Sequence, residues 1–208
     1  ELVDLGALEG GSRSYALGIA EDGTISGWAN GTYIGKNPVL WVDGVIQDLG
    51  SPPGWGTGES RAVNDLGQAA VTGESGSPQD YHGFLWDEGT YTDLGEFPPG
   101  GGYVMANDID NQGRVVGTCA PKAFIWEAGE MSDLGTLGGW AEAHGINEIG
   151  QVVGHCRPAT GEQLGFLWDD GVMTGFAPLP GHDNTQAFGV NDLGDAVGSS
   201  WYSLPPYF

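Results

Sequence analysis

The chain has 208 residues, with 28 acidic side chains against only six Lys or Arg, so its formal net charge at pH 7 is −22. Phosphate binding requires a basic patch that six cations cannot supply, which argues against nucleic acid and against an anionic membrane surface as partners. No apolar run approaches the roughly 18 residues of a membrane-spanning helix. The excess of acidic residues has two explanations. One is solubility in water or in a salty medium, and the other is binding of a divalent cation such as Ca²⁺.

The sequence is built from five copies of one repeat. Four copies begin with Asp-Leu-Gly, and a fifth, degenerate copy begins at Gly175. Such a period is typical of radial or linear repeat folds. The 39 Gly and 12 Pro recur at fixed offsets beside 8 Trp, 7 Tyr and 7 Phe, so they indicate the turns of a single all-β domain. The copies span residues 4–47, 48–92, 93–132, 133–174, and 175–208 together with 1–5.

Each of the first four copies predicts four short strands, with tight turns between the first and second and between the third and fourth. In the first copy these are residues 15–19, 24–29, 39–41 and 45–49. Asn, Asp and Gly occupy the turn between the first two strands, and Asp-Gly or a related pair follows the third, which is a strong hairpin signal. Residues 68–73 of the second copy carry two extra residues before their Gly, which predicts a β-bulge in that strand.

Four antiparallel strands per copy form a meander, and five such sheets arranged radially make a five-bladed β-propeller. A linear solenoid is disfavoured by the internal hairpins. Residues 1–5 align with the fourth strand at 45–49, although no sheet precedes them, and the final copy lacks that strand. We therefore expect Leu2 to Leu5 to complete the sheet that begins at Thr185, which would close the ring and remove two exposed sheet edges.

Two repeated residue types have structural interpretations that compete with functional ones. The Trp that ends each Phe-Leu-Trp-like third strand could stack on a sugar, but one Trp per sheet at one position favours packing between sheets. The Asp of each Asp-Leu-Gly could bind an ion, but it more simply accepts a hydrogen bond from the backbone of the following loop. These Trp residues are Trp41, Trp86, Trp126 and Trp168.

The pattern DLGTLGG…A.GIN..GQVVG…FLW..G.M.DLG resembles the HAF-type repeat of bacterial extracellular proteins. The fourth copy matches it nearly throughout, and the second copy retains a His, His82, before Phe-Leu-Trp. The other copies place Asn37, Lys122 and Leu164 at that position, which argues against a repeated His ligand. The resemblance covers essentially the whole chain and implies an exported protein. It implies no activity and no catalytic residues.

The loops between strands two and three and between sheets vary in length, and they lie on one face of the predicted fold. Variable loops on a rigid scaffold are where binding sites usually occur. Aromatic rings can stack on the C–H face of a sugar while carboxylates accept its hydroxyl hydrogens, so a carbohydrate is the expected ligand; the rings could instead pack within their own loops. The candidate ligand-binding residues are Trp55, Tyr103, Trp140, Tyr33, Tyr81, His182, Asp183 and Glu142.

Catalysis has weaker support than binding. Paired carboxylates could serve a glycosidase, but the sequence singles out no pair. It contains no nucleophile elbow, and its four His show no metal-ligand spacing. The prediction is a non-enzymatic extracellular binding module with a glycan or protein ligand, with no cofactor assigned and with Ca²⁺ as the candidate ion. A structural or protein-interaction subunit and a glycoside hydrolase or lyase are the alternatives.

The chain contains two cysteines, Cys119 and Cys156, at equivalent positions of neighbouring repeats. An even count in an exported protein favours a disulfide. Equivalent positions on adjacent sheets can also lie too far apart for disulfide geometry. A disulfide and two buried thiols therefore both remain open.

Overall fold

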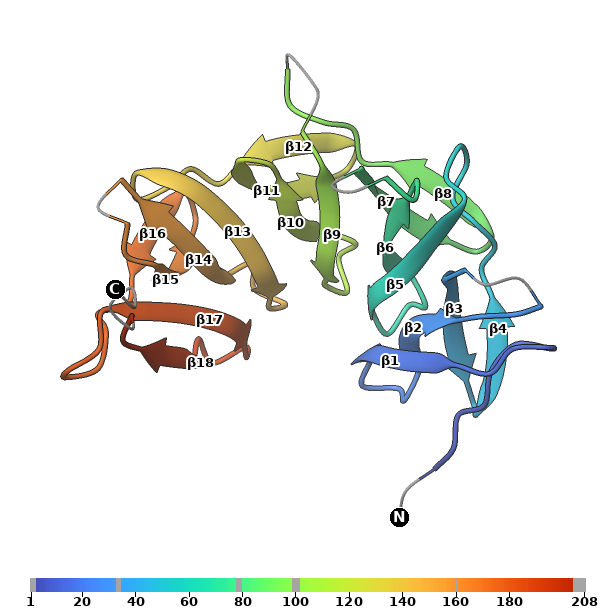
Figure 1. Ribbon diagram of the computed structural model, residues 1–208. Coiled ribbons are helices and arrows are strands. Elements are labelled where there is room, and N and C mark those ends of the chain that lie inside the picture. Colours follow the sequence, from blue (N-terminus) through green and yellow to red (C-terminus); the bar gives the residue numbers. More distant parts are fainter. Residues whose placement is uncertain (1–2, 33–34, 78–79, 99–101, 160, 204–208) are drawn as a thin grey trace, which may run out of the picture.

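The structure, a computed structural model, describes residues 3–32, 35–77, 80–98, 102–159 and 161–203 and is all-β (Figure 1). Its strands form five separate antiparallel sheets. Four sheets contain four strands in sequential order, and the fifth contains two. Within the described ranges, no helix has the length and apolar character needed to cross a membrane.

The strands follow the repeat, one sheet per copy. First strands are β1 (Ser14–Ile19), β5 (Thr57–Val63), β9 (Val104–Ile109), β13 (Gly139–Ile146) and β17 (Asn184–Val190). Second strands are β2 (Ile25–Ala29), β6 (Ala69–Glu74), β10 (Val115–Cys119), β14 (Val152–Pro158) and β18 (Ala196–Trp201). Third strands are β3 (Asn37–Val42), β7 (Tyr81–Asp87), β11 (Lys122–Glu127) and β15 (Leu164–Asp169). Fourth strands are β4 (Val45–Asp48), β8 (Thr90–Asp93), β12 (Glu130–Asp133) and β16 (Val172–Gly175).

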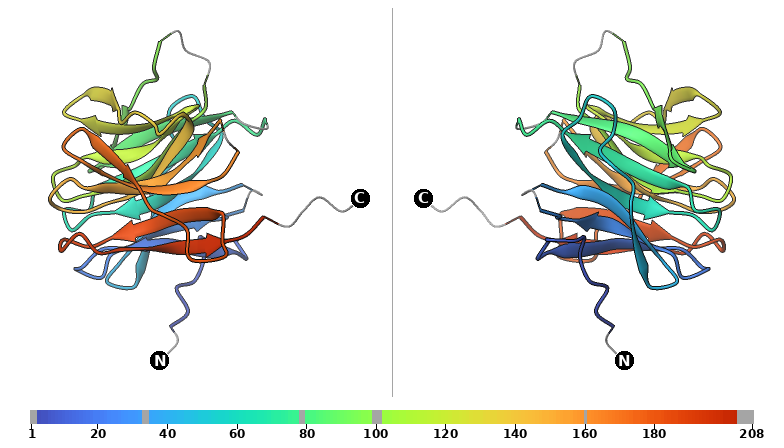
Figure 2. Two further views of the ribbon diagram at one scale, coloured as in Figure 1. Left: turned by 90° about the vertical axis from the view of Figure 1, so that its left-hand side faces the viewer. Right: turned by 90° about the vertical axis from the view of Figure 1, so that its right-hand side faces the viewer.

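The sheets are arranged along an arc, with the first strand of each on the inner side and the fourth on the outer side (Figure 1). Seen from the sides, the sheets lie together in one short, compact body (Figure 2). First strands of neighbouring sheets contact one another along the inner side. The loops between strands two and three therefore lie on the same face as the connections between sheets. This is the face predicted to carry the binding loops.

The expected ring closure by the N-terminal strand is not observed in the described residues. Val3 to Leu5 belong to no strand, and the β17–β18 sheet has only two strands. Leu5 instead packs against the buried residues of the first sheet, where its carbonyl accepts a 2.8 Å hydrogen bond from Trp41 Nε1. Leu2 and residues 204–208, on which the prediction also depended, lie outside the described residues.

The hairpins between third and fourth strands confirm the turn prediction. Asp43 and Gly44 both have positive φ, at 50° and 77°. Positive φ at both central residues is the backbone conformation that matches the twist of paired strands, and glycine adopts it without steric cost. The same pair of conformations recurs at Glu88-Gly89, Ala128-Gly129 and Asp170-Gly171.

The repeated Trp and Asp residues have the structural roles expected of them. Trp41, Trp86 and Trp126 are 1%, 6% and 6% exposed and lie within the apolar core, and Trp168 packs against it. Each described Asp-Leu-Gly makes the same turn, in which the Asp carboxylate accepts the N–H of the Gly two residues on, at 2.9 Å for Asp48. The Leu that follows then enters the core of the next sheet, as Leu49, Leu94 and Leu134 do.

The predicted bulge in the second strand of the second copy is wrong. β6 pairs with β7 in unbroken register, and Val71 occupies the position at which β2, β10 and β14 have Gly. The extra residue lies instead in the first strand, and it does so in every sheet. The bulged residues are Leu17, Arg61, Asn107, His144 and Phe188.

Of the two alternatives that the sequence left open for the cysteines, the structure has two thiols and no disulfide between them. Cys119 and Cys156 are buried free thiols. Each packs in a different apolar cluster, Cys119 in that of the third sheet and Cys156 in that of the fourth. Their side chains are held apart because each occupies the core of its own sheet.

Candidate ligand-binding face

The bulge in each first strand shapes the inner side of the arc. A bulge bends its strand and re-aims the extra side chain. As a result, bulged residues of neighbouring sheets touch: Arg61 Nη1 donates to Asn107 Oδ1 at 3.0 Å, and the rings of His144 and Phe188 lie 5.9 Å apart. Polar side chains thus converge where the second, third and fourth sheets meet.

A row of aromatic rings crosses the same face. The rings of Tyr81 and Tyr103 meet edge to face with their centres 6.3 Å apart. Tyr103 shares a side-chain hydrogen bond with Trp140, whose indole can only donate. Trp140 in turn meets the ring of His155 at 5.0 Å. Because the residues come from three different sheets, only the packing of the sheets brings them into one row.

Charged side chains lie beside this row. Lys36 Nζ lies 3.0 Å from Glu59 and 2.7 Å from Glu74, and Arg61 lies 2.8 Å from Glu59. Glu59 is only 7% exposed. Its carboxylate is held in place by ion pairs with both Lys36 and Arg61. Together with Tyr81, Tyr103 and Met105, these four residues line a cavity of about 290 Å³.

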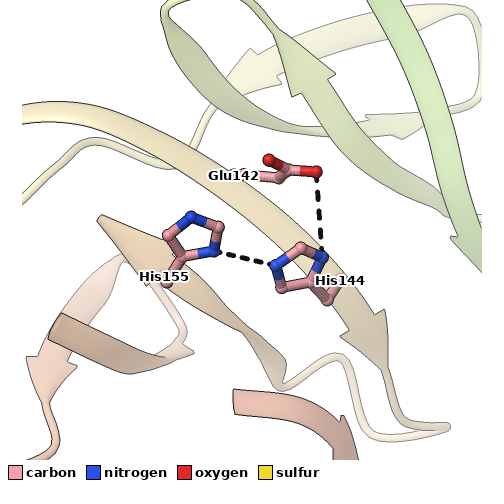
Figure 3. A group of neighbouring side chains, drawn as sticks. All are labelled: Glu142, His144 and His155. Carbon is pink, nitrogen blue, oxygen red and sulfur yellow. Dashed lines mark hydrogen bonds and ion pairs between the residues drawn. The ribbon is translucent and has the colours of Figure 1, made fainter. Parts of the chain in front are cut away.

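At the end of the aromatic row, one carboxylate and two imidazoles converge on the fourth sheet (Figure 3). His144 Nε2 and His155 Nδ1 are 2.8 Å apart, and Glu142 Oε1 lies 3.8 Å from His144 Nδ1. The strands explain the cluster, because Glu142 and His155 face each other across the β13–β14 pair and His144 is the bulged residue. Burial lowers the pKa of both imidazoles to about 4, so the two rings are uncharged at neutral pH.

The structure gathers only part of the residue set predicted from sequence. Tyr81, Tyr103, Trp140 and Glu142 lie together, as described above. Trp55 lies elsewhere, stacked on His82 at 5.5 Å beside the core of the second sheet.

His182 and Asp183 belong to the fifth sheet, where His182 Nδ1 contacts Ser200 Oγ at 3.0 Å and Asp183 accepts the N–H of Ser203 at 2.8 Å. Tyr33 lies outside the described residues.

Sequence reasoning missed His144 and His155 because it searched for the helical spacing of metal ligands. The signal was nevertheless present. Glu142-x-His144 puts two side chains on one face of a strand, and the turn at 147–150 sets the hairpin register that brings His155 opposite Glu142. A single copy does not reveal the bulge in the first strand. The extra residue recurs in the first strand of all five copies.

The opposite face carries acidic turns, and these residues stabilise the arc. In the first four turns, a backbone N–H donates to the side chain of the next sheet's turn, for example from Glu21 to Asp65 at 2.7 Å and from Glu148 to Asp192 at 2.9 Å. A cavity of about 370 Å³ lies here, and in its wall burial raises the pKa of Asp108 to about 6. Asp65 and Asp192 thus accept backbone N–H groups of the preceding turns.

No protein-family model and no curated protein matches this chain. The fold and the site therefore define the class of the protein: an all-β repeat protein with an aromatic and charged face on its inner and loop-bearing side.

Proposed function

We propose that the protein is a non-enzymatic binding module that recognises a carbohydrate on the face formed by Tyr81, Tyr103 and Trp140. The observation that carries the proposal is the aromatic row beside the charged cavity. Aromatic rings offer a flat apolar surface with a polar edge, which suits a ligand whose faces are apolar and whose rim is hydroxylated. The cavity of about 290 Å³ is close to the lower bound of small-molecule sites.

The polar groups around the row fit the hydroxyl groups of a sugar. Glu59 and Glu74 offer acceptors, and Lys36 and Arg61 offer donors, all within one connected set of ion pairs. Such a set is held in place before the ligand arrives, so little side-chain entropy is lost on binding. A neutral glycan suits this site, because the charges of Lys36 and Arg61 balance those of Glu59 and Glu74.

Binding should depend on Trp140. In a screen of a glycan array followed by calorimetric titration of the best ligand, Trp140→Ala should weaken binding at least roughly tenfold, since truncating a central aromatic anchor typically costs about 2 kcal/mol or more. Trp55→Ala is the matched control and should bind as the unchanged protein does, because Trp55 lies outside the row. Failure to bind any glycan, or equal affinity of the Trp140→Ala protein, would refute the proposal. Release of reducing ends would instead favour the hydrolase alternative.

The extracellular location and the membership of the HAF-type repeat family are also proposals. They rest on the Asp-Leu-Gly, Gly-Ile-Asn and Phe-Leu-Trp motifs at fixed spacing. The five separate sheets, one per copy, agree with a repeat of this length. The high acidic excess is compatible with a protein that must stay soluble outside the cell.

We further propose that the arc closes into a five-bladed propeller when the N-terminal segment adds to the β17–β18 sheet. Two observations support closure. Asp4-Leu5-Gly6 makes the same turn as the three Asp-Leu-Gly segments that follow fourth strands elsewhere in the chain, with Gly6 N 2.9 Å from Asp4 Oδ1. Val197 on β18 is 67% exposed, whereas its equivalents Val116 and Val153 are fully buried by a following sheet.

Hydrogen–deuterium exchange tests this closure. If the N-terminal segment covers β18, deletion of residues 1–4 should speed amide exchange in β18 and leave β12 unchanged as an internal control. Unchanged exchange in β18 would contradict closure. If protection of β18 instead grows with protein concentration, a second chain covers this edge, which favours the interaction-module alternative. Ile19 on β1 is 70% exposed, whereas its equivalents Val63, Ile109 and Ile146 are buried, so the first sheet presents a second uncovered surface that ring closure or a second chain would cover.

A further inference from the structure

The structure assigns a metal site to Glu142, His144 and His155: we propose that these residues bind one zinc ion or a similar divalent transition metal. One ligand atom from each residue lies within 4.8 Å of the others. The three side chains point toward one another from the paired strands β13 and β14 (Figure 3). This inference does not rest on carbohydrate recognition.

The spacing of the ligand atoms is close to that of an occupied site. Two nitrogens bound tetrahedrally to one zinc ion, each at about 2.0–2.1 Å, are separated by about 3.3 Å. His144 Nε2 and His155 Nδ1 are 2.8 Å apart, so a small rotation of the rings makes room for an ion. The hydrogen-bonded strands fix both backbones, because Glu142 pairs directly with His155. Glu142 Oε1 lies 3.8 Å from the other ring nitrogen of His144, Nδ1, so the His144 ring must turn to present one nitrogen between both neighbours. One carboxylate with two imidazoles then matches a familiar zinc ligand set that leaves one position open.

Without an ion, two neighbours lie within hydrogen-bond distance of His144 Nε2, which can bond to only one of them. Its Nε2 is approached by His155 Nδ1 at 2.8 Å and by Gln186 Nε2 at 2.9 Å. Gln163 donates to Gln186 Oε1 at 3.2 Å, which turns the Gln186 amide nitrogen toward His144. A ring nitrogen has one lone pair or one hydrogen, so it cannot serve both neighbours. A metal ion that takes the lone pairs of both imidazoles replaces the hydrogen bond between the two rings, and the Gln186 amide then turns away from His144.

The ligand types decide which metal is expected. Imidazole suits Zn²⁺, Cu²⁺ and Ni²⁺, whereas Ca²⁺ takes oxygen ligands only. Glu142 supplies the negative charge, and Asn107 donates a hydrogen bond to its carboxylate. The nearby Arg61 is ion-paired with Glu59 at 2.8 Å, which offsets its repulsion of a cation. The Ca²⁺ that the acidic composition suggested is therefore not expected here.

The third sheet of the repeat shows which side chains can stand in place of the two imidazoles. Asn107 of the third sheet is equivalent to His144, and Thr118 is equivalent to His155. Since the same backbone already accommodates Asn and Thr at these positions, His144→Asn and His155→Thr remove a ligand with little risk to folding. His82→Asn is the matched control, because His82 lies away from the cluster and bonds to Asp93 at 2.7 Å.

The test is calorimetric titration of zinc chloride into the untagged full chain after treatment with a chelator. The expected result is one zinc ion per chain, with at least about 100-fold weaker binding in His144→Asn and in His155→Thr, because even outer-shell changes cost 10–100-fold. His82→Asn should bind as the unchanged protein does. Cobalt should give the visible absorption of a tetrahedral site, absent in both variants.

Three results would overturn the proposal. The first is the absence of zinc binding to the unchanged chain. The second is retention of full affinity in both His variants, which would place the ion elsewhere. The third is Ca²⁺ binding with equal affinity at a stoichiometry that competes with zinc, which would identify an oxygen site instead.

Discussion

Replacing Asp110 by Asn should lower the free energy of unfolding by about 3–5 kcal/mol, the range for breaking one partner of a buried ion pair. The side chain of Asp110 is fully buried, and that of Arg114 is 13% exposed. One carboxylate oxygen accepts the N–H groups of Gln112 and Arg114 at 2.9 Å, and the other accepts the guanidinium at 2.5 Å. The substitution leaves Arg114 as a buried charge without its counter-ion.

A second substitution should recover most of that loss. At the equivalent position of the second sheet, Asn64 Nδ2 donates to Gln68 Oε1 at 2.9 Å, and the fourth sheet repeats the pair with Asn147 and Gln151 at 3.0 Å. Asp110→Asn combined with Arg114→Gln recreates this neutral pair in the third sheet. Urea unfolding of the unchanged protein, the two single variants and the double variant measures the coupling between the residues. A double variant no more stable than Asp110→Asn alone would contradict the expectation.

Replacing Trp41 by Ala should also destabilise the protein by about 3–5 kcal/mol, as truncation of a large buried aromatic side chain does. Trp41 is 1% exposed, and it packs with Ala29 and Val39 in the core of the first sheet. Its indole N–H also holds the carbonyl of Leu5 at 2.8 Å, which ties the N-terminal segment to this sheet. Both the apolar contacts and the anchoring bond are lost in the Ala variant.

Two other Trp variants separate these contributions. Trp41→Phe keeps most of the ring but loses the bond to Leu5, so it should cost less than Trp41→Ala, with about 1 kcal/mol from the bond. Trp28→Ala, on the neighbouring strand, removes a partly exposed ring that stacks on Tyr15 at 4.6 Å. The loss in free energy of unfolding in Trp28→Ala should be well below that in Trp41→Ala. Chemical unfolding followed by circular dichroism gives all three values, and equal losses in Trp28→Ala and Trp41→Ala would show that burial does not set the cost.

The sequence alone was enough to predict the strands and most of their turns, because those signals are local. Asp43-Gly44 and its equivalents require positive φ, and each gave a hairpin where it was expected. The repeat then allowed each element to be checked against the other copies. It also showed that Trp41 and its counterparts occupy one structural position, which the structure confirms as core.

The composition of the binding face depended on tertiary structure. Trp55 and Trp140 both lie near variable loops in the sequence, yet only Trp140 joins the row with Tyr103, because Trp55 packs on His82. Likewise, the turn that sets Glu142 opposite His155 was predicted, but the bulge at His144 was not, because the sequence indicated a bulge only in residues 68–73 of the second copy.

Local sequence determined which residues form strands and which strands pair, since backbone conformation and side-chain alternation depend on near neighbours. The packing of one sheet on the next decided which side chains meet. Tyr81, Tyr103 and Trp140 come from three sheets, and no signal within one repeat specifies the distances between them. The bulge shared by all first strands decided what faces the inner side of the arc, because it adds one residue and changes the direction of the side chains around it.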